Sequence, residues 1–256
     1  MALPEIIRNL LENGVHFGHL SKHWNPRMKK FIFGKKKNIY IIDLEKTADL
    51  LEKSREFIEE MVKDDGKMLF VATKKQLRDT IRELATQCEM PFIVERWIGG
   101  FLTNFPTILS RIQTYTNLKK QKETGGLNKL PHKEKVKLSK ELDRMDKIYS
   151  GVGEMRQLPQ CVFIVDPKKE IACVREANKL SIPVIALIDT DGDPESIDYP
   201  IPGNDDAIKS VRAITSYLIE AIAKARKQSK DAPQAASEPN QEQKEPAQEV
   251  VEDSQK

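Results

Sequence analysis

Two groups of residues in this sequence have types and spacing that could do chemistry. The first is Asp189-Thr190-Asp191-Gly192-Asp193, which directly follows an apolar run. Two aspartates separated by one residue can act as nucleophile and proton donor in metal-dependent phosphatases. Such enzymes place Thr or Val after the glycine, where this chain has Asp193, and little sequence follows to supply further ligands. We therefore predict a turn here, with phosphatase chemistry at Asp189 and Asp191 as the alternative.

The second group is the three histidines His16, His19 and His23, which lie in one short segment. They could hold a metal ion, but no cysteine lies near them, and zinc sites usually use three or four spaced ligands with supporting carboxylates. We favour an RNA-facing or packing role and predict no metal site. Because the three lie together, no Ser-His-Asp or Cys-His arrangement can be built from them, and no catalytic residue is predicted.

Motifs for nucleotide cofactors are missing from the sequence. The only G-x-G, Gly151-Val152-Gly153, follows a predicted helix instead of joining a strand to a helix. There is no G-x-x-x-x-G-K-[ST] phosphate loop, and Gly99-Gly100 lacks the Lys-Ser/Thr pair that would reach phosphate and magnesium. The sequence therefore predicts no cofactor and no small-molecule substrate.

A binding surface is predicted instead in the segment Gly14–Asp43, where lysines and aromatic residues are dense and an apolar run follows. Lysines suit phosphates, arginines can pair with phosphate or stack on a base, and flat rings can stack on unpaired bases. We expect at least one of Phe17, Phe31 and Phe33 to pack in the core. By residue type, the candidate RNA contacts are His16, His23, Trp24, Arg27, Lys29, Lys30, Phe31, Phe33, Lys35, Lys36, Lys37, Arg96 and Arg111.

Charge is distributed unevenly along the chain of 256 residues. From residue 230 onward three lysines oppose seven acids, a net charge of −4, and the overall charge of +3 therefore leaves +7 for residues 1–229. A basic body suits a polyanionic partner. The last residues, 228–256, contain no aromatic, Leu or Ile side chain, and we expect a disordered acidic tail.

Compartment and solubility follow from composition. No apolar run approaches the length of a membrane span, and the first residues lack a signal-peptide pattern. Cys88, Cys161 and Cys173 lie in apolar patterns and are expected to be buried free thiols in a reducing compartment. We expect a cytoplasmic protein with no membrane partner.

Predicted strands of four to seven residues alternate with predicted helices over most of the chain. This alternation is typical of a parallel sheet covered by helices on both faces, in a flavodoxin-like or Rossmann-like α/β fold. An aspartate at position 43 is expected to cap the first long helix, and Asn204 or Asp205 the last. The predicted strands are 38–43, 67–73, 90–94, 160–166 and 183–189.

About sixty residues between the third and fourth predicted strands break this rhythm. Narrow apolar stripes, Ile108/Ile112/Tyr115 and Leu138/Leu142/Met145/Tyr149, flank a region with Gly125-Gly126 and Pro131. They predict an inserted antiparallel helical hairpin of the coiled-coil type. Its exterior is basic, with eleven Lys or Arg against five acids from Arg111 to Lys147. That exterior could face RNA or only solvent.

Several collinear blocks in this chain resemble the bacterial family of small ribosomal subunit protein two. The resemblance covers residues from about Pro4 to Lys224. The blocks are GVHFGH (Gly14–His19), WNP (Trp24–Pro26), FIFG (Phe31–Gly34), IIDL (Ile41–Leu44), LFVATKKQ (Leu69–Gln76), RWIGGFLTNF (Arg96–Phe105) and DYPIPGNDDAI (Asp198–Ile208). Local departures from the family pattern occur at Glu95, at Arg156-Gln157 and at Asp191-Gly192.

The resemblance implies a non-enzymatic protein of the small ribosomal subunit with a flavodoxin-like domain and a coiled-coil hairpin. It implies binding to small-subunit ribosomal RNA between head and body, contacts with neighbouring ribosomal proteins, and a part in anchoring ribosomal protein one. It adds His19, Lys74, Lys75 and Asn104 to the candidate contacts. The expected division is 1–103 and 153–227 for the α/β domain, 104–152 for the hairpin and 228–256 for the tail.

The favoured hypothesis is therefore a structural, ribosome-bound RNA-binding protein that acts in translation. The main alternative is the phosphatase at Asp189 and Asp191. A cell-surface adhesin is a third possibility, against which the missing signal-peptide pattern argues.

Overall fold

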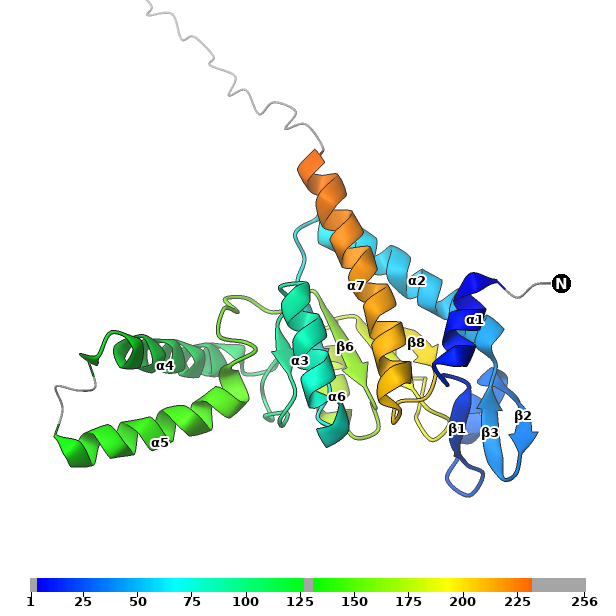
Figure 1. The fold of residues 1–256 in the computed structure, drawn as a ribbon, viewed down its shortest axis with the longest axis horizontal. Helices are drawn as coiled ribbons and strands as arrows, with labels where there is room; N and C mark the ends of the chain where they lie inside the picture. The colour runs from blue at the N-terminus through cyan, green and yellow to red at the C-terminus, as the bar shows by residue number, and fades with distance from the viewer. Residues whose placement is uncertain (1–3, 127–130, 232–256) are drawn as a thin grey trace, which may run out of the picture.

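The computed structural model describes residues 4–126 and 131–231, and these form two β-sheets with helices packed around the larger one (Figure 1). The larger sheet has five parallel strands in the order β5-β4-β6-β7-β8, flanked by helices as in flavodoxin-like folds. The smaller sheet has three antiparallel strands in the order β1-β3-β2. The strands are β1 Phe17–Leu20, β2 Ile32–Lys36, β3 Ile39–Ile42, β4 Met68–Val71, β5 Phe92–Ile93, β6 Cys161–Val165, β7 Val184–Ile188 and β8 Tyr199–Pro202.

Helices connect these strands in the predicted alternating order. Asp43 caps the first long helix, where its side chain accepts a hydrogen bond from the Glu45 backbone N–H, as predicted. Two short 3-10 helices, η1 and η2, precede β2 and α3. The helices are α1 Glu5–Glu12, η1 Pro26–Phe31, α2 Leu44–Lys63, η2 Lys75–Leu77, α3 Arg78–Gln87, α4 Phe105–Glu123, α5 His132–Tyr149, α6 Ile171–Lys179 and α7 Ile208–Asp231.

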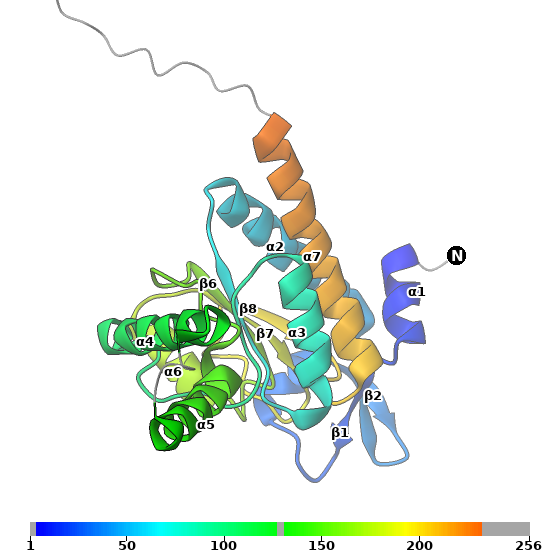
Figure 2. The same ribbon diagram turned by 60° about the vertical axis from the view of Figure 1, so that its left-hand side comes forward.

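The core lies on both faces of the parallel sheet. Strands β4, β6 and β7 are buried at every position, so their side chains alternate between two apolar clusters. One cluster joins the sheet to α1, α2, α3 and α7, and Figures 1 and 2 show α3 and α7 side by side over that face. The other joins it to α6, the base of α4 and α5, and η1. All three cysteines are buried and free, as predicted.

The N-terminal sheet is the main departure from the predicted topology. Ile39–Ile42 is a strand, as predicted, but it pairs antiparallel with β1 and β2 and does not join the parallel sheet. Strands β1 and β2 were not predicted. The turn between β2 and β3 consists of Lys37 and Asn38, both with positive φ, which is the two-residue geometry that fits the twist of a hairpin.

Strand β8 was also not predicted, because its sequence Tyr-Pro-Ile-Pro contains two prolines. It lies at the edge of the sheet, where a missing backbone donor is tolerated.

Two helices in the predicted hairpin region project from the sheet, as Figure 1 shows. Ile108, Ile112 and Tyr115 of α4 are buried, and Leu142 and Tyr149 of α5 complete the stripe. This packing confirms the predicted antiparallel helix pair, whereas the domain boundaries at 103/104 and 152/153 stay a prediction.

The last helix, α7, packs Val211, Thr215, Leu218 and Ile222 into the core, whereas Ile208 at its start is exposed. The helix continues to Asp231, beyond the predicted start of the tail at residue 228. Residues 232–256, which hold the rest of that prediction, lie outside the described residues.

Candidate nucleic-acid interface

The exposed lysines of the N-terminal segment are held on a buried base. Met28 and Phe31 of η1 are buried against the parallel sheet, which fixes the short helix in place. Lys29 and Lys30 are therefore presented to solvent. Lys35, Lys36 and Lys37 are exposed at the β2–β3 turn. None of these five lysines has an ion pair with a described acidic residue. The segment thus presents unneutralised positive charge.

Its aromatic residues divide between packing and exposure. Phe31 belongs to the core, which confirms the expectation that at least one phenylalanine packs there. Phe33 is 79% exposed and Phe17 is 48% exposed, so both offer free ring surface. The Trp24 ring lies 5.1 Å from that of Tyr40, half-buried against the antiparallel sheet. Only the exposed rings are available to stack on a base.

The three histidines are not brought together. The His19 ring is 2.8 Å from a carboxylate oxygen of Asp189, and its other nitrogen is 3.4 Å from Asp206. The hydrogen bond to Asp189 outweighs burial and raises the pKa of His19 to about 9. His16 packs against the ring of Phe17 at 4.0 Å, and burial lowers its pKa, while His23 is exposed.

His19 instead shares a small cluster with two aspartates. Ligand atoms of His19, Asp205 and Asp206 lie within 4.8 Å of one another, and theirs is the one group of potential metal ligands among the described residues. Asp205 is buried. Burial, together with the nearby charges of Asp166 and Asp189, raises the pKa of Asp205 to about 7 against the opposing effect of Lys74. The prediction that the chain holds no metal is not tested by this geometry.

Lys74 differs from the exposed lysines because three carboxylates surround its ammonium group. Its ammonium is 2.8 Å from Asp205, 2.8 Å from Asp206 and 3.0 Å from Asp166. Burial alone would lower the pKa of Lys74, but these carboxylates outweigh it and raise the pKa. Lys74 therefore ties the ends of β4 and β6 to the segment before α7. Its neighbour Lys75 is exposed.

The aspartate-rich turn after β7 is occupied by internal contacts. Asp189 is 2% exposed, and it accepts hydrogen bonds from the backbone N–H groups of His19 and Thr190 in addition to its pairing with the His19 ring. Asp191 pairs with Lys168 at 2.8 Å, and Arg27 pairs with Asp193. The Gly192 N–H also donates to the backbone oxygen of Asp189 at 3.0 Å, which closes the turn predicted at this position.

Arg27 has a second acidic partner, Glu195, at 3.2 Å. The predicted contact Arg27 thus joins η1 to the turn after β7 and is half-exposed. Arg96 and Asn104 are exposed on the segment that leads from β5 into α4, and Arg111 is exposed within α4. They lie on a different part of the chain from the β2–β3 turn, so the predicted set divides into two groups.

The segment between Arg96 and Asn104 is fixed to α6 by hydrogen bonds to the side chain of Glu176. Its carboxylate accepts hydrogen bonds from the indole of Trp97 and from the backbone N–H groups of Gly100, Leu102 and Thr103. Sequence reasoning missed this residue. The sequence feature that could have indicated it is a glutamate directly beside the apolar stripe Cys173, Val174 and Ala177 on the same helix.

Comparison with known proteins matches this chain to the family model described as ribosomal protein S2, over residues 10–225. The chain belongs to the ribosomal protein S2 family. It is also 49% identical over 220 residues to the small ribosomal subunit protein uS2 of Coprothermobacter proteolyticus, and the match covers 86% of this chain and 82% of the relative.

Membership of the S2 family confirms the resemblance seen in the sequence blocks, and the family is one of structural ribosomal proteins. Family membership is consistent with the structure, in which the carboxyl ends of the parallel strands carry ion pairs such as Lys74–Asp166 and no nucleotide-binding motif is found among the described residues. Among the described residues, no helix combines the length and apolar character needed to cross a membrane.

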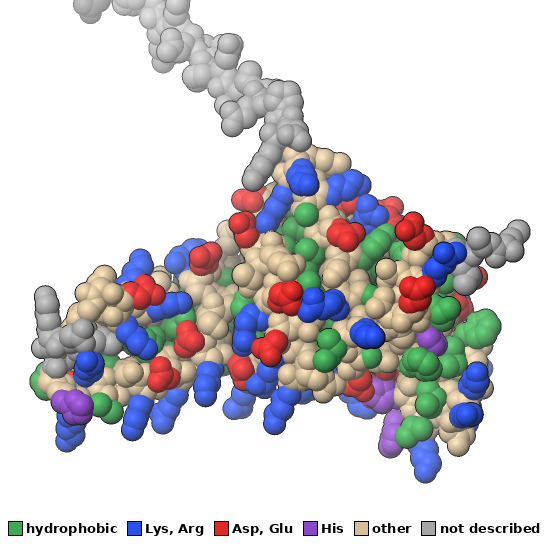
Figure 3. All heavy atoms as spheres, viewed as in Figure 1, with side chains coloured by type: hydrophobic (Ala, Val, Ile, Leu, Met, Phe, Trp, Pro, Cys, Tyr) green, Lys and Arg blue, Asp and Glu red, His purple; other side chains and the backbone are tan. Residues whose placement is uncertain are grey.

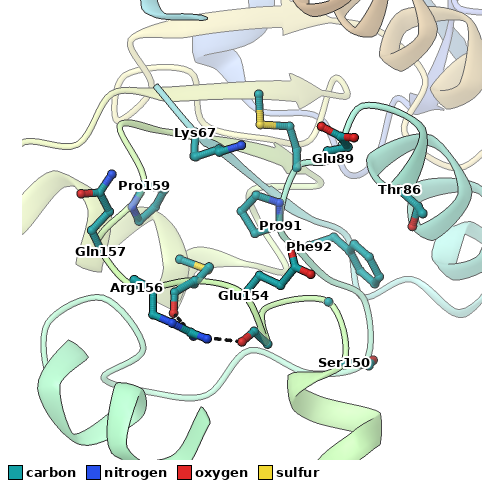
Figure 4. A pocket seen from close by; sticks show the side chains of 14 residues that line it. Lys67, Thr86, Glu89, Pro91, Phe92, Ser150, Glu154, Arg156, Gln157 and Pro159 are labelled. Carbon is teal, nitrogen blue, oxygen red and sulfur yellow. Dashed lines mark hydrogen bonds between the residues drawn. The ribbon is translucent and has the colours of Figure 1, made fainter. Parts of the chain in front are cut away.

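A cavity of about 490 Å³ lies at the opposite edge of the S2-family sheet, beside the start of β5 and the loop after α5 (Figure 4). Lys67, Pro91, Phe92, Glu154 and Arg156 are among the residues that line it. The Arg156 guanidinium donates to the backbone oxygens of Gly153 and Met155, so it braces the loop. These lining residues contain no nucleophile paired with a base.

Proposed function

We propose that this protein is a structural constituent of the small ribosomal subunit, where it binds small-subunit ribosomal RNA between head and body in the cytoplasm. The observation that carries the proposal is the family match over residues 10–225, combined with exposed lysines that no described acid neutralises. Neighbouring ribosomal proteins are the other partners, and ribosomal protein one is anchored partly through this chain.

The contacts divide by their surroundings. Lysines without acidic partners can release counterions on meeting phosphate, whereas a lysine already surrounded by carboxylates gains little. Lys74, His19 and Arg27 therefore act by pairing with acidic residues of this chain, which positions the surrounding segments. His16 and Trp24 contact the rings of Phe17 and Tyr40 and support the surface by packing. The proposed direct RNA contacts are His23, Lys29, Lys30, Lys35, Lys36, Lys37, Lys75, Arg96, Asn104 and Arg111.

Sedimentation of cell extracts tests the proposal. Tagged wild-type protein is expected to co-sediment with small subunits, and a variant with Lys35, Lys36 and Lys37 replaced by Gln is expected to shift toward the unbound fractions. The matched control replaces Lys63, Lys209 and Lys227, three exposed lysines on α2 and α7, by Gln. Wild-type protein found only in the soluble fraction, in extracts with intact ribosomes, would refute the proposal.

The part played toward ribosomal protein one has its own test. Small subunits purified from cells depleted of this chain are expected to carry less ribosomal protein one, and adding the purified chain back is expected to restore it. Unchanged amounts after depletion would remove this partner from the proposal and leave RNA binding standing.

A further inference from the structure

Helix α5 carries a row of positive side chains with a regular spacing. Lys133, Lys137, Lys140, Arg144 and Lys147 follow one another at intervals of four, three, four and three residues, and all five are exposed. Residues three and four apart lie on the same face of a helix. At about 100° per residue, the five positions fall within an arc of about 80°.

This row faces away from the rest of the hairpin. The side chains that pack toward α4, led by the buried Leu142 and Tyr149, lie about 150° around the helix from the centre of the row. Figure 3 shows Lys and Arg side chains projecting along the lower edge of the molecule, from the hairpin toward the antiparallel sheet. The row is therefore presented outward, where a large partner can reach every member.

Asp143 and Asp146, two of the four acids of α5, are engaged by α4, and Glu134 and Glu141 make no ion pair with the row among the described residues. Asp143 lies 3.9 Å from Lys122 of α4, and Asp146 accepts the hydroxyl hydrogen bond of Tyr115 at 2.7 Å. Both acids thus lie toward α4. Within the described part of the chain, none of the five cations of the row has an ion pair. Five outward charges left unpaired on one helix face favour a polyanionic partner.

The geometry distinguishes between forms of that polyanion. From Lys133 to Lys147 the helix rises about 21 Å, in steps of about 4.5 to 6 Å, so the charges form a straight track. The track contains no aromatic side chain, and binding of single strands normally combines such charges with aromatic rings on which bases stack. Duplex RNA is recognised chiefly by shape and by its phosphate backbone.

We propose that α5 is a rail for the phosphate backbone of base-paired RNA, bound without regard to sequence through Lys133, Lys137, Lys140, Arg144 and Lys147. The proposal deepens the proposed function, since it rests on ribosomal RNA as the partner and specifies the form of RNA that the hairpin takes. The β2–β3 turn, with the exposed Phe33 nearby, has the rings that the α5 row lacks and is suited to unpaired RNA.

The experiment uses the full chain with two RNA probes, a duplex of about 20 base pairs and an unstructured single strand of equal length. The test variant replaces Lys137, Lys140 and Arg144 by Gln, which keeps helix propensity. The control variant is K63Q/K209Q/K227Q, with the same change in net charge. Circular dichroism establishes that both variants keep their helix content.

Affinity for the duplex is measured across a range of salt concentrations. Each phosphate contact contributes about 0.7 to 0.9 to the slope of log affinity against log salt, so losing three contacts should make the slope shallower by about two to three. The affinity of the test variant for the duplex should fall about tenfold or more at moderate salt, whereas the control should keep the wild-type slope.

Equal slopes for the test variant and wild type, or a wild-type preference for the single strand, would overturn the rail. A test variant that leaves small subunits while keeping its duplex affinity would overturn it too, and would identify a protein as the partner of α5. Each of these results, with wild-type protein still co-sedimenting with small subunits, leaves the proposed function standing. Failure of wild-type co-sedimentation instead refutes the proposed function.

Discussion

Glu176 and Trp97 connect α6 to the segment that enters the hairpin. One carboxylate oxygen of Glu176 accepts the indole N–H of Trp97 at 3.0 Å and the backbone N–H of Gly100 at 2.8 Å. The other accepts the backbone N–H groups of Leu102 and Thr103 at 3.0 and 3.2 Å. A single side chain thereby satisfies four donors that no regular element would pair, and it fixes the path between the sheet and α4.

Replacing Glu176 by Ala is therefore expected to lower the free energy of unfolding by about 2 to 4 kcal/mol, because donors in a partly buried segment lose a charged acceptor. Arg175→Ala, at the adjacent exposed position on the same helix, is expected to change it by less than about 0.5 kcal/mol. Urea unfolding of the three proteins measures the difference. Equal destabilisation by the two substitutions would contradict this role for Glu176.

The same carboxylate gives a pH dependence. Burial by itself would raise the pKa of Glu176, but the hydrogen bonds from Trp97 and the backbone outweigh it and lower the pKa. A lowered pKa in the folded state contributes stability above the unfolded value of about 4.3, and this is lost as pH falls. The stability advantage of wild type over Glu176→Gln should therefore shrink between pH 5 and pH 3, as followed by urea unfolding. A constant difference would exclude this linkage.

His19 is expected to act in the opposite pH direction. Its pKa is raised to about 9, so the stability from its pairing with Asp189 is complete below the unfolded value of about 6.5 and is lost as pH rises through 9. Since the ring is about a third exposed, solvent screening limits the effect to about 1 to 2 kcal/mol.

His19→Gln should accordingly be less stable than wild type at pH 6 and approach it at pH 10. Chemical unfolding with a chelator in the buffer measures this without interference from a bound cation. The exposed His23→Gln serves as the control and should show no such trend. Identical pH profiles for the two variants would disprove the His19–Asp189 linkage.

Lys74 and Lys75 are adjacent but are expected to respond differently to substitution. Lys74→Met removes the ammonium between three carboxylates and leaves the buried Asp205 without its counter-charge, which should cost about 3 kcal/mol. Because burial raises the pKa of Asp205 to about 7, the cost should be smaller at pH 5, where this carboxyl is protonated, than at pH 8.

Lys75→Met should leave stability within about 0.5 kcal/mol of wild type and weaken binding to ribosomal RNA. Thermal unfolding and an RNA-binding measurement on both variants separate the two roles. A stable Lys74→Met variant with reduced RNA affinity would reverse this assignment.

Gly151 allows the end of the hairpin to approach the sheet. A Cβ at this position would lie 2.3 Å from the backbone oxygen of Phe92, and the Phe92 N–H donates to the Gly151 oxygen at 3.0 Å. Gly151→Ala must therefore push α5 and β5 apart, and a loss of about 2 kcal/mol or more is expected. Gly99→Ala, where an added Cβ meets nothing within 4 Å, is the control and should be neutral. Comparable melting temperatures for both variants would contradict the close approach.

The sequence indicated the parallel sheet because buried strands leave nearly continuous apolar runs, as in Met68–Val71 and Val184–Ile188. It indicated the hairpin because stripes such as Ile108, Ile112 and Tyr115 recur at helical spacing. Strand β8 escaped prediction because its prolines conceal an edge strand. Strand β1 escaped because Gly18 and His19 interrupt its apolar pattern, and β2 escaped because Gly34, Lys35 and Lys36 interrupt its own.

The candidate site shows a similar division. Residue types alone determined the basic character of Lys29, Lys30 and Lys35–Lys37, because nothing in their neighbourhood along the chain opposes it, and collinear blocks determined the family. Only the tertiary structure decided which charges are free. Lys74 meets Asp205, and His19 meets Asp189, across more than a hundred residues of sequence. A local pattern carries no information about such distant partners, because the folding of the sheet brings them together.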